Sequence, residues 1–220
     1  MIAYHFISEK YALDVLSDQR MKLSLFKDLN DPFELLAADQ PDPDSRNMAN
    51  TFKEFMAGKY GLLCFSKNWK NPLLWSHYAN KHKGVALEFY IKDEFALPVT
   101  YSKVRFNIDW KEKILKKSIN REETKGLWLT KFESWHYEEE IRIICNQSDC
   151  IKNENILFHP LNDDISLQGI ILGPLCELQT EDIKDKLPTG KEIKVIKSRL
   201  AFRSFNIVKQ ERFKSTKIKN

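Results

Sequence analysis

Glycine is scarce in this sequence: only seven of its 220 residues are glycine. None of them falls in the G-x-G-x-x-G pattern of dinucleotide-binding folds or in the G-x-x-x-x-G-K pattern of phosphate-binding loops. Both patterns need glycine because the loop backbone must approach a phosphate group closely. The sequence therefore argues against a Rossmann or P-loop nucleotide site.

Cysteine is also sparse, and long apolar runs are missing. The four cysteines include no C-x-x-C pair, and no secretory signal precedes them, which is typical of a reducing compartment. No apolar run comes near the ~20 residues that a membrane-spanning helix needs. We therefore expect a soluble cytoplasmic protein with free thiols and no membrane contact. The cysteines are Cys64, Cys145, Cys150 and Cys176.

Neither sign of charge dominates. The chain has 35 Lys and Arg against 31 Asp and Glu, and a formal net charge of +4 is too small to indicate a nucleic-acid-binding protein by itself. His77 and His82 do not have the spacing of an H-x-x-x-H or H-E-x-x-H zinc motif. We therefore expect no bound metal.

Apolar periodicity predicts an α+β fold with a mixed, largely antiparallel sheet and flanking helices. The segments after residue 135 are mostly strands with short connections, which favours antiparallel pairing. Length and composition suit one globular domain over residues 1–213, followed by a basic flexible tail over 214–220. The predicted strands are 2–7, 21–25, 61–66, 85–91, 99–101, 156–159, 168–172, 192–202 and 205–209, and the predicted helices follow Ser8 and cover 44–59, 73–79, 109–133 and 180–187.

Residues 135–145 combine three carboxylates, an arginine and an apolar tail. Read as a strand, this segment places Glu138, Glu140 and Arg142 on one face, while Tyr137 and Ile143 face the other way. Two carboxylates on one strand face repel each other, so at least one should resist ionisation unless Arg142 or another cation compensates. The row suits acid–base chemistry and a structural ion-pair ladder about equally.

Three further groups are candidates for a site, and each has a structural explanation as well. His5 lies in an apolar strand, so it must find a hydrogen-bond partner in the core or line a cleft. Trp75 and Tyr78 share one face of a predicted helix and are most simply core residues, while His77 points elsewhere. The sequence N-D-P-F-E at residues 30–34 is typical of a turn.

In order and spacing, these segments resemble a bacterial family known as domain of unknown function 2971. The resemblance runs from residue 4 to about residue 145, and the last third of the chain matches only as generic strands. The family name implies no activity. The motifs are Y-H-F at residues 4–6, L-N-D-P-F-E at 29–34, C-F-S at 64–66, L-W-S-H-Y-A at 74–79, H-K-G-V at 82–85 and W-x-Y-E-x-E-x-R at 135–142.

The chain also resembles, more distantly, the ADP-ribosyltransferase fold with its split sheet. In that fold an early histidine or arginine holds the NAD ribose, a central aromatic or serine shapes the nicotinamide pocket, and a late glutamate completes catalysis. His5, Tyr78 and Glu140 occur in that order, and Glu138 with Glu140 is similar to the Glu-x-Glu doublet of arginine-directed members. Two features depart from the pattern: no Ser-Thr-Ser segment precedes the glutamates, and residues 75–78 suit a helix better than a strand.

This second resemblance implies an enzyme that cleaves NAD, as its substrate, and transfers ADP-ribose to water or to a protein or nucleic-acid acceptor. Glu140 would stabilise the positive charge that develops on the ribose, Glu138 would orient or activate the acceptor, and His5 would hydrogen-bond the ribose. The implied substrate-binding residues are the aromatic residues Trp75, Tyr78, Trp135 and Tyr137, the imidazole of His77, the cations Arg142 and Arg199 for the pyrophosphate, and Asn30 with Asp31.

Two other functions fit the same residues. The aromatic residues and segment 30–34 would form a recognition cleft for a protein or nucleic acid in a non-catalytic module, which the basic residues between 191 and 219 favour. A hydrolase or nuclease would use the carboxylates with a divalent cation.

Overall fold

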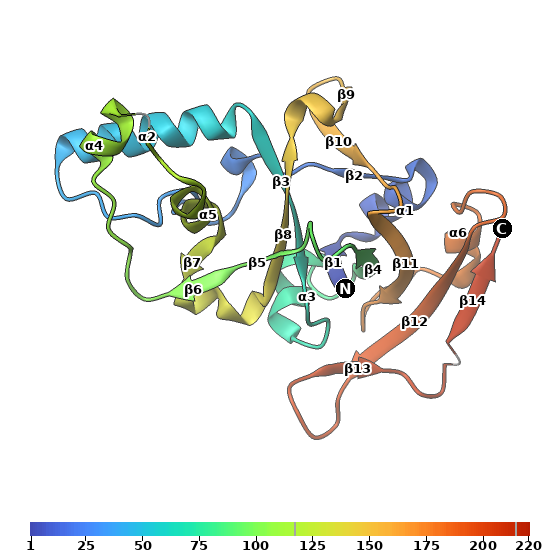
Figure 1. The fold of residues 1–220 in the computed structure, drawn as a ribbon. Helices are drawn as coiled ribbons and strands as arrows, with labels where there is room; N and C mark the ends of the chain where they lie inside the picture. Colours follow the sequence, from blue (N-terminus) through green and yellow to red (C-terminus); the bar gives the residue numbers. More distant parts are fainter. Residues whose placement is uncertain (117, 214) are drawn as a thin grey trace.

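The computed structural model describes residues 1–116, 118–213 and 215–220, and it has an α+β fold (Figure 1). The main sheet has the strand order β13-β12-β11-β4-β1-β3-β8-β5, with β14 also paired to β12. Its pairings are antiparallel except for that of β11 with β12, which confirms the predicted fold class. The strands are β1 (Ile2–Ile7), β3 (Tyr60–Ser66), β4 (Val85–Ile91), β5 (Leu97–Pro98), β8 (Glu140–Asn146), β11 (Ile165–Leu172), β12 (Glu192–Leu200), β13 (Ile207–Lys209) and β14 (Thr216–Lys219).

The main sheet is divided between β1 and β3. Six residue pairs oppose each other between β1 and β4, and seven between β3 and β8. By contrast, β1 and β3 are matched at a single pair, Tyr4 and Ser66. The two strands separate beyond that pair, and the gap is bridged by a 2.9 Å hydrogen bond from Nδ1 of His5 to the carbonyl oxygen of Cys64.

The helices flank the sheet because each buries an apolar face. In Figure 1, α2, α4 and α5 lie together on one side of β3 and β8, around a core that contains Phe52, Trp110 and Leu127. The side chain of Asp42 caps α2, and Asn120 and Glu123 form a capping box on α5. The helices are α1 (Glu9–Asp18), α2 (Pro43–Ala57), α3 (Pro72–Tyr78), α4 (Trp110–Leu115), α5 (Arg121–Leu129) and α6 (Thr180–Lys184), with 3₁₀ turns η1 (Phe26–Asp28), η2 (Glu133–Glu138) and η3 (Gln147–Asp149).

Two small sheets complete the fold. The first has the order β2-β10-β9, and the second pairs β6 with β7 in parallel. No helix among the described residues is long and apolar enough to cross a membrane. The four cysteines are free thiols. The strands of the small sheets are β2 (Arg20–Lys22), β6 (Thr100–Ser102), β7 (Thr130–Phe132), β9 (Ile151–Asn153) and β10 (Ile156–Pro160).

Two predicted segments take a different form. The predicted strand at 135–145 begins only at Glu140, because the preceding residues form η2 and Glu139 adopts the left-handed conformation at φ 44° and ψ 48°. At the C-terminus, residues 216–219 form β14 in place of the predicted flexible tail. Ile218 anchors this strand with 5% of its surface exposed, while Lys214 lies outside the described residues.

Candidate functional site

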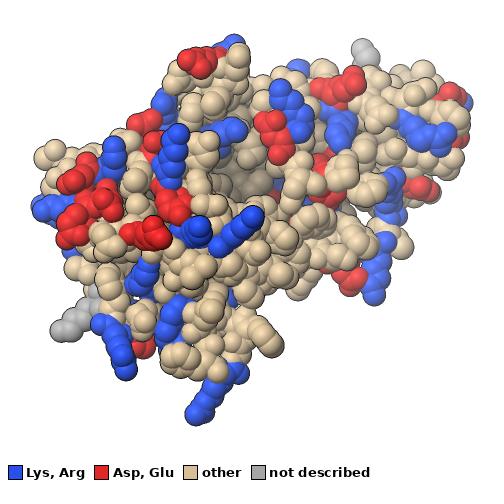
Figure 2. Space-filling model, turned by 180° about the vertical axis from the view of Figure 1, so that it is seen from behind, with Lys and Arg blue, Asp and Glu red and all other residues tan. Residues whose placement is uncertain are grey.

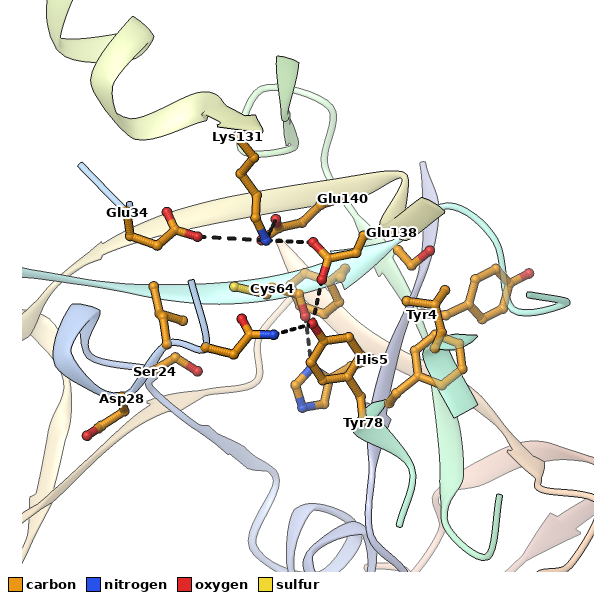
Figure 3. Close-up of a pocket in the computed structure, with 16 residues that line it drawn as sticks. Tyr4, His5, Ser24, Asp28, Glu34, Cys64, Tyr78, Lys131, Glu138 and Glu140 are labelled. Carbon is orange, nitrogen blue, oxygen red and sulfur yellow. Dashed lines mark hydrogen bonds and ion pairs between the residues drawn. The ribbon is translucent and has the colours of Figure 1, made fainter. Parts of the chain in front are cut away.

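A cavity of about 260 Å³ lies at the gap between β1 and β3 (Figure 3). Its walls come from distant parts of the chain: β1, the segment around η1, the end of β3, α3, and the region from β7 to the start of β8. The division of the main sheet therefore has a direct consequence, because it opens a space that continuous strand pairing would have closed. The residues that line this cavity and are used below are His5, Asn30, Glu34, Tyr78, Lys131, Glu138 and Glu140.

Arg142 anchors a buried ion network beside the cavity. Its side chain is only 1% exposed. The guanidinium has five N–H groups, and all of them are used. Two pair with each of the carboxylates Glu34 and Glu140 at 2.6–3.1 Å, and one more bond of 2.6 Å reaches the carbonyl oxygen of Trp128. Arg142 therefore has no N–H left to donate to a ligand.

Lys131 lies among three carboxylates of the same network (Figure 3). Its Nζ is 2.6 Å from Glu138, 3.2 Å from Glu140 and 3.7 Å from Glu34. Burial alone would lower the pKa of Lys131, but the three carboxylates outweigh burial and raise it. The ammonium group stays charged and occupies the position that a cation would take between these side chains. Among the described residues, no group of three or more His, Cys, Asp and Glu side chains is arranged to hold a metal.

The two carboxylates of the Glu-x-Glu pair have different environments. Burial pushes the pKa of Glu140 upward, but Arg142 and Lys131 overcome that effect and lower it. For Glu138, burial prevails over the attraction of Lys131, and its pKa is raised. Glu140 is thus held as a carboxylate, whereas Glu138 is the group that takes up a proton more readily.

Glu138 also ends a chain of hydrogen bonds that crosses the cavity. The hydroxyl of Tyr78 donates to Glu138 Oε1 at 2.5 Å, and the amide of Asn30 donates to the same hydroxyl at 2.7 Å. Burial and the neighbouring Glu138 charge raise the pKa of Tyr78, so this hydroxyl keeps its proton. The carboxylate is therefore fixed in orientation by one hydroxyl and one ammonium group.

His5 faces the cavity from β1 as a neutral imidazole. Burial lowers its pKa, although the bond to the Cys64 carbonyl acts in the opposite direction. A carbonyl oxygen only accepts, so the proton is on Nδ1 and Nε2 is an acceptor. Within the described part of the chain, Nε2 of His5 has no hydrogen-bond partner. It is therefore the ring atom that is free to contact a ligand.

The left-handed turn at Glu139 explains why Glu138 and Glu140 converge. In a continuous strand these side chains would simply follow one another along a face. Here Glu138 ends η2 and Glu140 begins β8, and the turn between them brings both carboxylates to Lys131. Glu139 itself points elsewhere, where its side chain accepts a bond from Asn68.

The structure brings together five of the predicted site residues and separates the others. His5, Asn30, Tyr78, Glu138 and Glu140 line the cavity.

The other predicted site residues do not line this cavity. Trp75 is fully buried in the core. Arg142 belongs to the ion network, which corrects the prediction that it binds a pyrophosphate. Asp31 is buried, and its side chain accepts a hydrogen bond from the backbone amide of Phe33, two residues further along, as in a turn. Arg199 stacks on Phe202 in another region, and His77, Trp135 and Tyr137 form a row of ring contacts with Tyr78 outside the cavity.

Sequence reasoning missed two members of the network. Glu34 closes the N-D-P-F-E motif, but its role depends on Arg142, which is 108 residues further along the chain. Lys131 follows a helix in a lysine-rich region and has no local signal that separates it from surface lysines. Its one suggestive neighbour is Trp135, whose ring lies 4.9 Å from Nζ.

Comparison with known proteins gives a family match for part of the chain that forms this site. No curated protein and no solved structure gives a significant match. Residues 74–143 match the family described as protein of unknown function (DUF2971), and this segment includes Tyr78, Lys131, Glu138, Glu140 and Arg142. The resemblance to the ADP-ribosyltransferase fold stays a prediction. Between α3 and β8, the chain is therefore similar to the DUF2971 family of unknown function.

Proposed function

We propose that the cavity between β1 and β3 binds the nicotinamide–ribose end of NAD and cleaves the bond between them, so that ADP-ribose is transferred to water or to a macromolecule. The observation that carries the proposal is the convergence of His5 with Glu138 and Glu140 on one cavity. These residues come from β1, η2 and β8, and they meet where the main sheet divides. A split sheet and this set of side chains are what the ADP-ribosyltransferase resemblance implies.

The charge of the ion network suits this reaction. Three carboxylates and two cations leave one excess negative charge when all are ionised. Cleavage of the nicotinamide–ribose bond builds positive charge on the ribose, and a fixed negative charge nearby stabilises that state more than the ground state. Arg142 supplies one positive charge to the two carboxylates Glu34 and Glu140, and Lys131 contacts all three carboxylates, so the excess negative charge is shared across the network that ends at Glu138.

The different environments of Glu138 and Glu140 support roles other than those that the resemblance implies. Glu140 is lowered in pKa and bound by both Arg142 and Lys131, which suits a positioning residue. Glu138 has a raised pKa and is oriented by Tyr78 and Lys131, which suits the carboxylate beside the ribose. Glu138 would then stabilise the ribose cation or hold a ribose hydroxyl, and His5 Nε2 would accept a second ribose hydroxyl.

The size of the cavity limits which part of NAD it admits. At about 260 Å³ it is just below the range of about 300–1,000 Å³ that is usual for whole ligands. It would hold the nicotinamide and its ribose, while the rest of the molecule lies outside. The rings of His77 and Tyr137 continue from Tyr78 at centroid distances of 6.0 and 6.1 Å and offer an apolar surface there.

The test is the release of nicotinamide from NAD by the purified chain. We expect the wild type to release nicotinamide, with free ADP-ribose indicating transfer to water and ADP-ribose attached to added protein or nucleic acid indicating a macromolecular acceptor. Glu140→Gln removes the excess negative charge and should lower the rate by about 10²–10³-fold. An undiminished rate in Glu140→Gln, or no release and no thermal stabilisation of the wild type by NAD, would overturn the proposal.

A further inference from the structure

The loop between β12 and β13 exposes large apolar side chains in an unusual concentration. Phe202 is 88% exposed and Phe205 is 96% exposed, and Leu200 beside them is 59% exposed. Single apolar residues on a surface need no explanation, but several on one projecting loop indicate an interaction site. In Figure 1 this loop extends away from the sheet at the lower edge of the molecule.

The loop is held in a defined shape. The amide of Ala201 donates to the carbonyl oxygen of Asn206 at 2.9 Å, which closes the turn. At its base, Ile207 is buried and its amide donates to the carbonyl oxygen of Lys70, just before α3. The two phenylalanine rings are therefore presented from a fixed support, which lowers the entropic cost of binding a partner.

Positive charge is concentrated around the same rings. Residues 197–212 contain five Lys and Arg and one Glu, which equals the formal net charge of +4 for the whole chain. The guanidinium of Arg199 lies 4.3 Å from the centroid of Phe202, and Arg203 is exposed between the two phenylalanines. In Figure 2, Lys and Arg side chains project from the lower protrusion, where Figure 1 places this loop. This positive charge favours an anionic partner.

We propose that the β12–β13 loop binds single-stranded nucleic acid. Exposed rings provide faces on which unpaired bases stack, and neighbouring arginines contact the phosphates. An anionic membrane fits less well, because Arg203, Ser204 and Asn206 interrupt the apolar side chains. A second copy of the chain would bring two positively charged loops together.

The location of the loop links this surface to the cavity, although the proposal does not rest on the proposed NAD chemistry. The base of the loop is bonded to Lys70, and the side chain of the next residue, Asn71, donates to the carbonyl oxygen of Tyr137. Tyr137 belongs to the ring row that begins at Tyr78 in the cavity wall. The base of the loop is therefore connected to this row through residues 70 and 71.

The experiment measures fluorescence anisotropy of labelled oligo-dT and oligo-rU of about 16 nucleotides, the upper end of the usual site size. We expect salt-dependent binding by the wild type. Removing both rings in Phe202→Ala/Phe205→Ala should weaken binding at least about tenfold. In Arg199→Gln/Arg203→Gln, the slope of log affinity against log salt should fall by about 0.7 for each phosphate that the variant no longer binds.

A matched control exists on α1, where Lys10 lies over the ring of the exposed Tyr11. Lys10→Gln/Tyr11→Ala should bind as the wild type does, and thermal melts should show that all variants are folded. Binding to vesicles of phosphatidylcholine with phosphatidylserine tests an anionic membrane as the partner. Sedimentation of the chain alone tests a second copy of the chain. The proposal would be overturned if the wild type did not bind the oligonucleotides, or if the α1 control weakened binding as much as the loop variants do. It would also be overturned if the loop variants lost only vesicle binding or only self-association.

Discussion

The two ends of the buried ion network differ in how fully their polar groups are used. At the Arg142 end, every guanidinium N–H has a partner, and both Glu34 and Glu140 face it directly. At the Glu138 end, the carboxylate has a raised pKa, and the nearby His5 offers an unpaired Nε2 to the cavity. The first end is complete without a ligand, whereas the second can still form bonds.

We infer from this difference that the cluster contains charges that stabilise the fold and a charge that is available to a ligand. A buried charge that is fully paired resists change, because removing one partner leaves the other uncompensated. A buried group whose pKa is displaced and that faces a cavity can respond to a ligand. We therefore expect substitutions of Arg142 and Glu34 to act on folding and substitutions of Glu138 to act on chemistry, whereas Glu140, which contacts both Arg142 and Lys131, should affect both.

The largest effect on stability is expected for Arg142→Met. This change leaves Glu34 and Glu140 buried beside each other with only Lys131 to compensate, and it should cost about 3–5 kcal/mol of unfolding free energy. Denaturant unfolding measures this loss. The triple variant Arg142→Met/Glu34→Gln/Glu140→Gln removes the uncompensated charges and should recover part of it. A loss below about 1 kcal/mol in the single variant would mean that the network does not stabilise the fold.

Tyr78→Phe should have an intermediate effect, because it removes one hydroxyl that bonds both Glu138 and Asn30. The loss of these bonds should cost about 1–3 kcal/mol in unfolding free energy. The Tyr78 bond also lowers the pKa of Glu138, so its removal should raise that pKa further. If ionised Glu138 is needed, the pH midpoint for nicotinamide release should move to higher pH, and an unchanged midpoint would separate Tyr78 from the reaction.

The smallest effect is expected from the titration of His5. Its folded pKa lies below the ordinary value of 6.5, so the unfolded chain binds more protons and stability should fall as the pH drops below 6.5. The loss is at most about 1.4 kcal/mol per pH unit from one group. His5→Asn keeps a donor for the Cys64 carbonyl and cannot titrate. Its stability should therefore change less than that of the wild type between pH 6.5 and 5, as measured by unfolding at each pH.

Much of the framework could be predicted from local patterns. The alternating or fully apolar segments at β1, β3 and β4 and the helical spacing at α3 correspond to the elements found. The strand predicted at 135–145 was wrong in its first half, because a left-handed turn at Glu139 has no sequence signal in a run of three glutamates. Non-glycine residues rarely adopt this conformation, and tertiary contacts decide where they do.

The site could be predicted only in part, because tertiary contacts also decide which side chains meet there. His5, Tyr78 and Glu140 were candidates from local patterns, a resemblance implied their roles, and all three line the cavity. Arg142 was expected to face Glu138 or Glu140, and it does contact Glu140, but its second carboxylate is the distant Glu34. Pairings across 108 residues depend on the packed fold, so neither spacing nor periodicity could reveal them.

The most direct test of this account compares nicotinamide release by two neighbouring glutamate variants. Glu138→Gln changes the carboxylate in the cavity, whereas Glu139→Gln changes a side chain that bonds Asn68 outside it. We predict that Glu138→Gln stays folded and releases nicotinamide from NAD at least about 100-fold more slowly than the wild type, while Glu139→Gln stays within a few-fold. Equal rates for the two variants would contradict the assignment of the Glu138 end to chemistry.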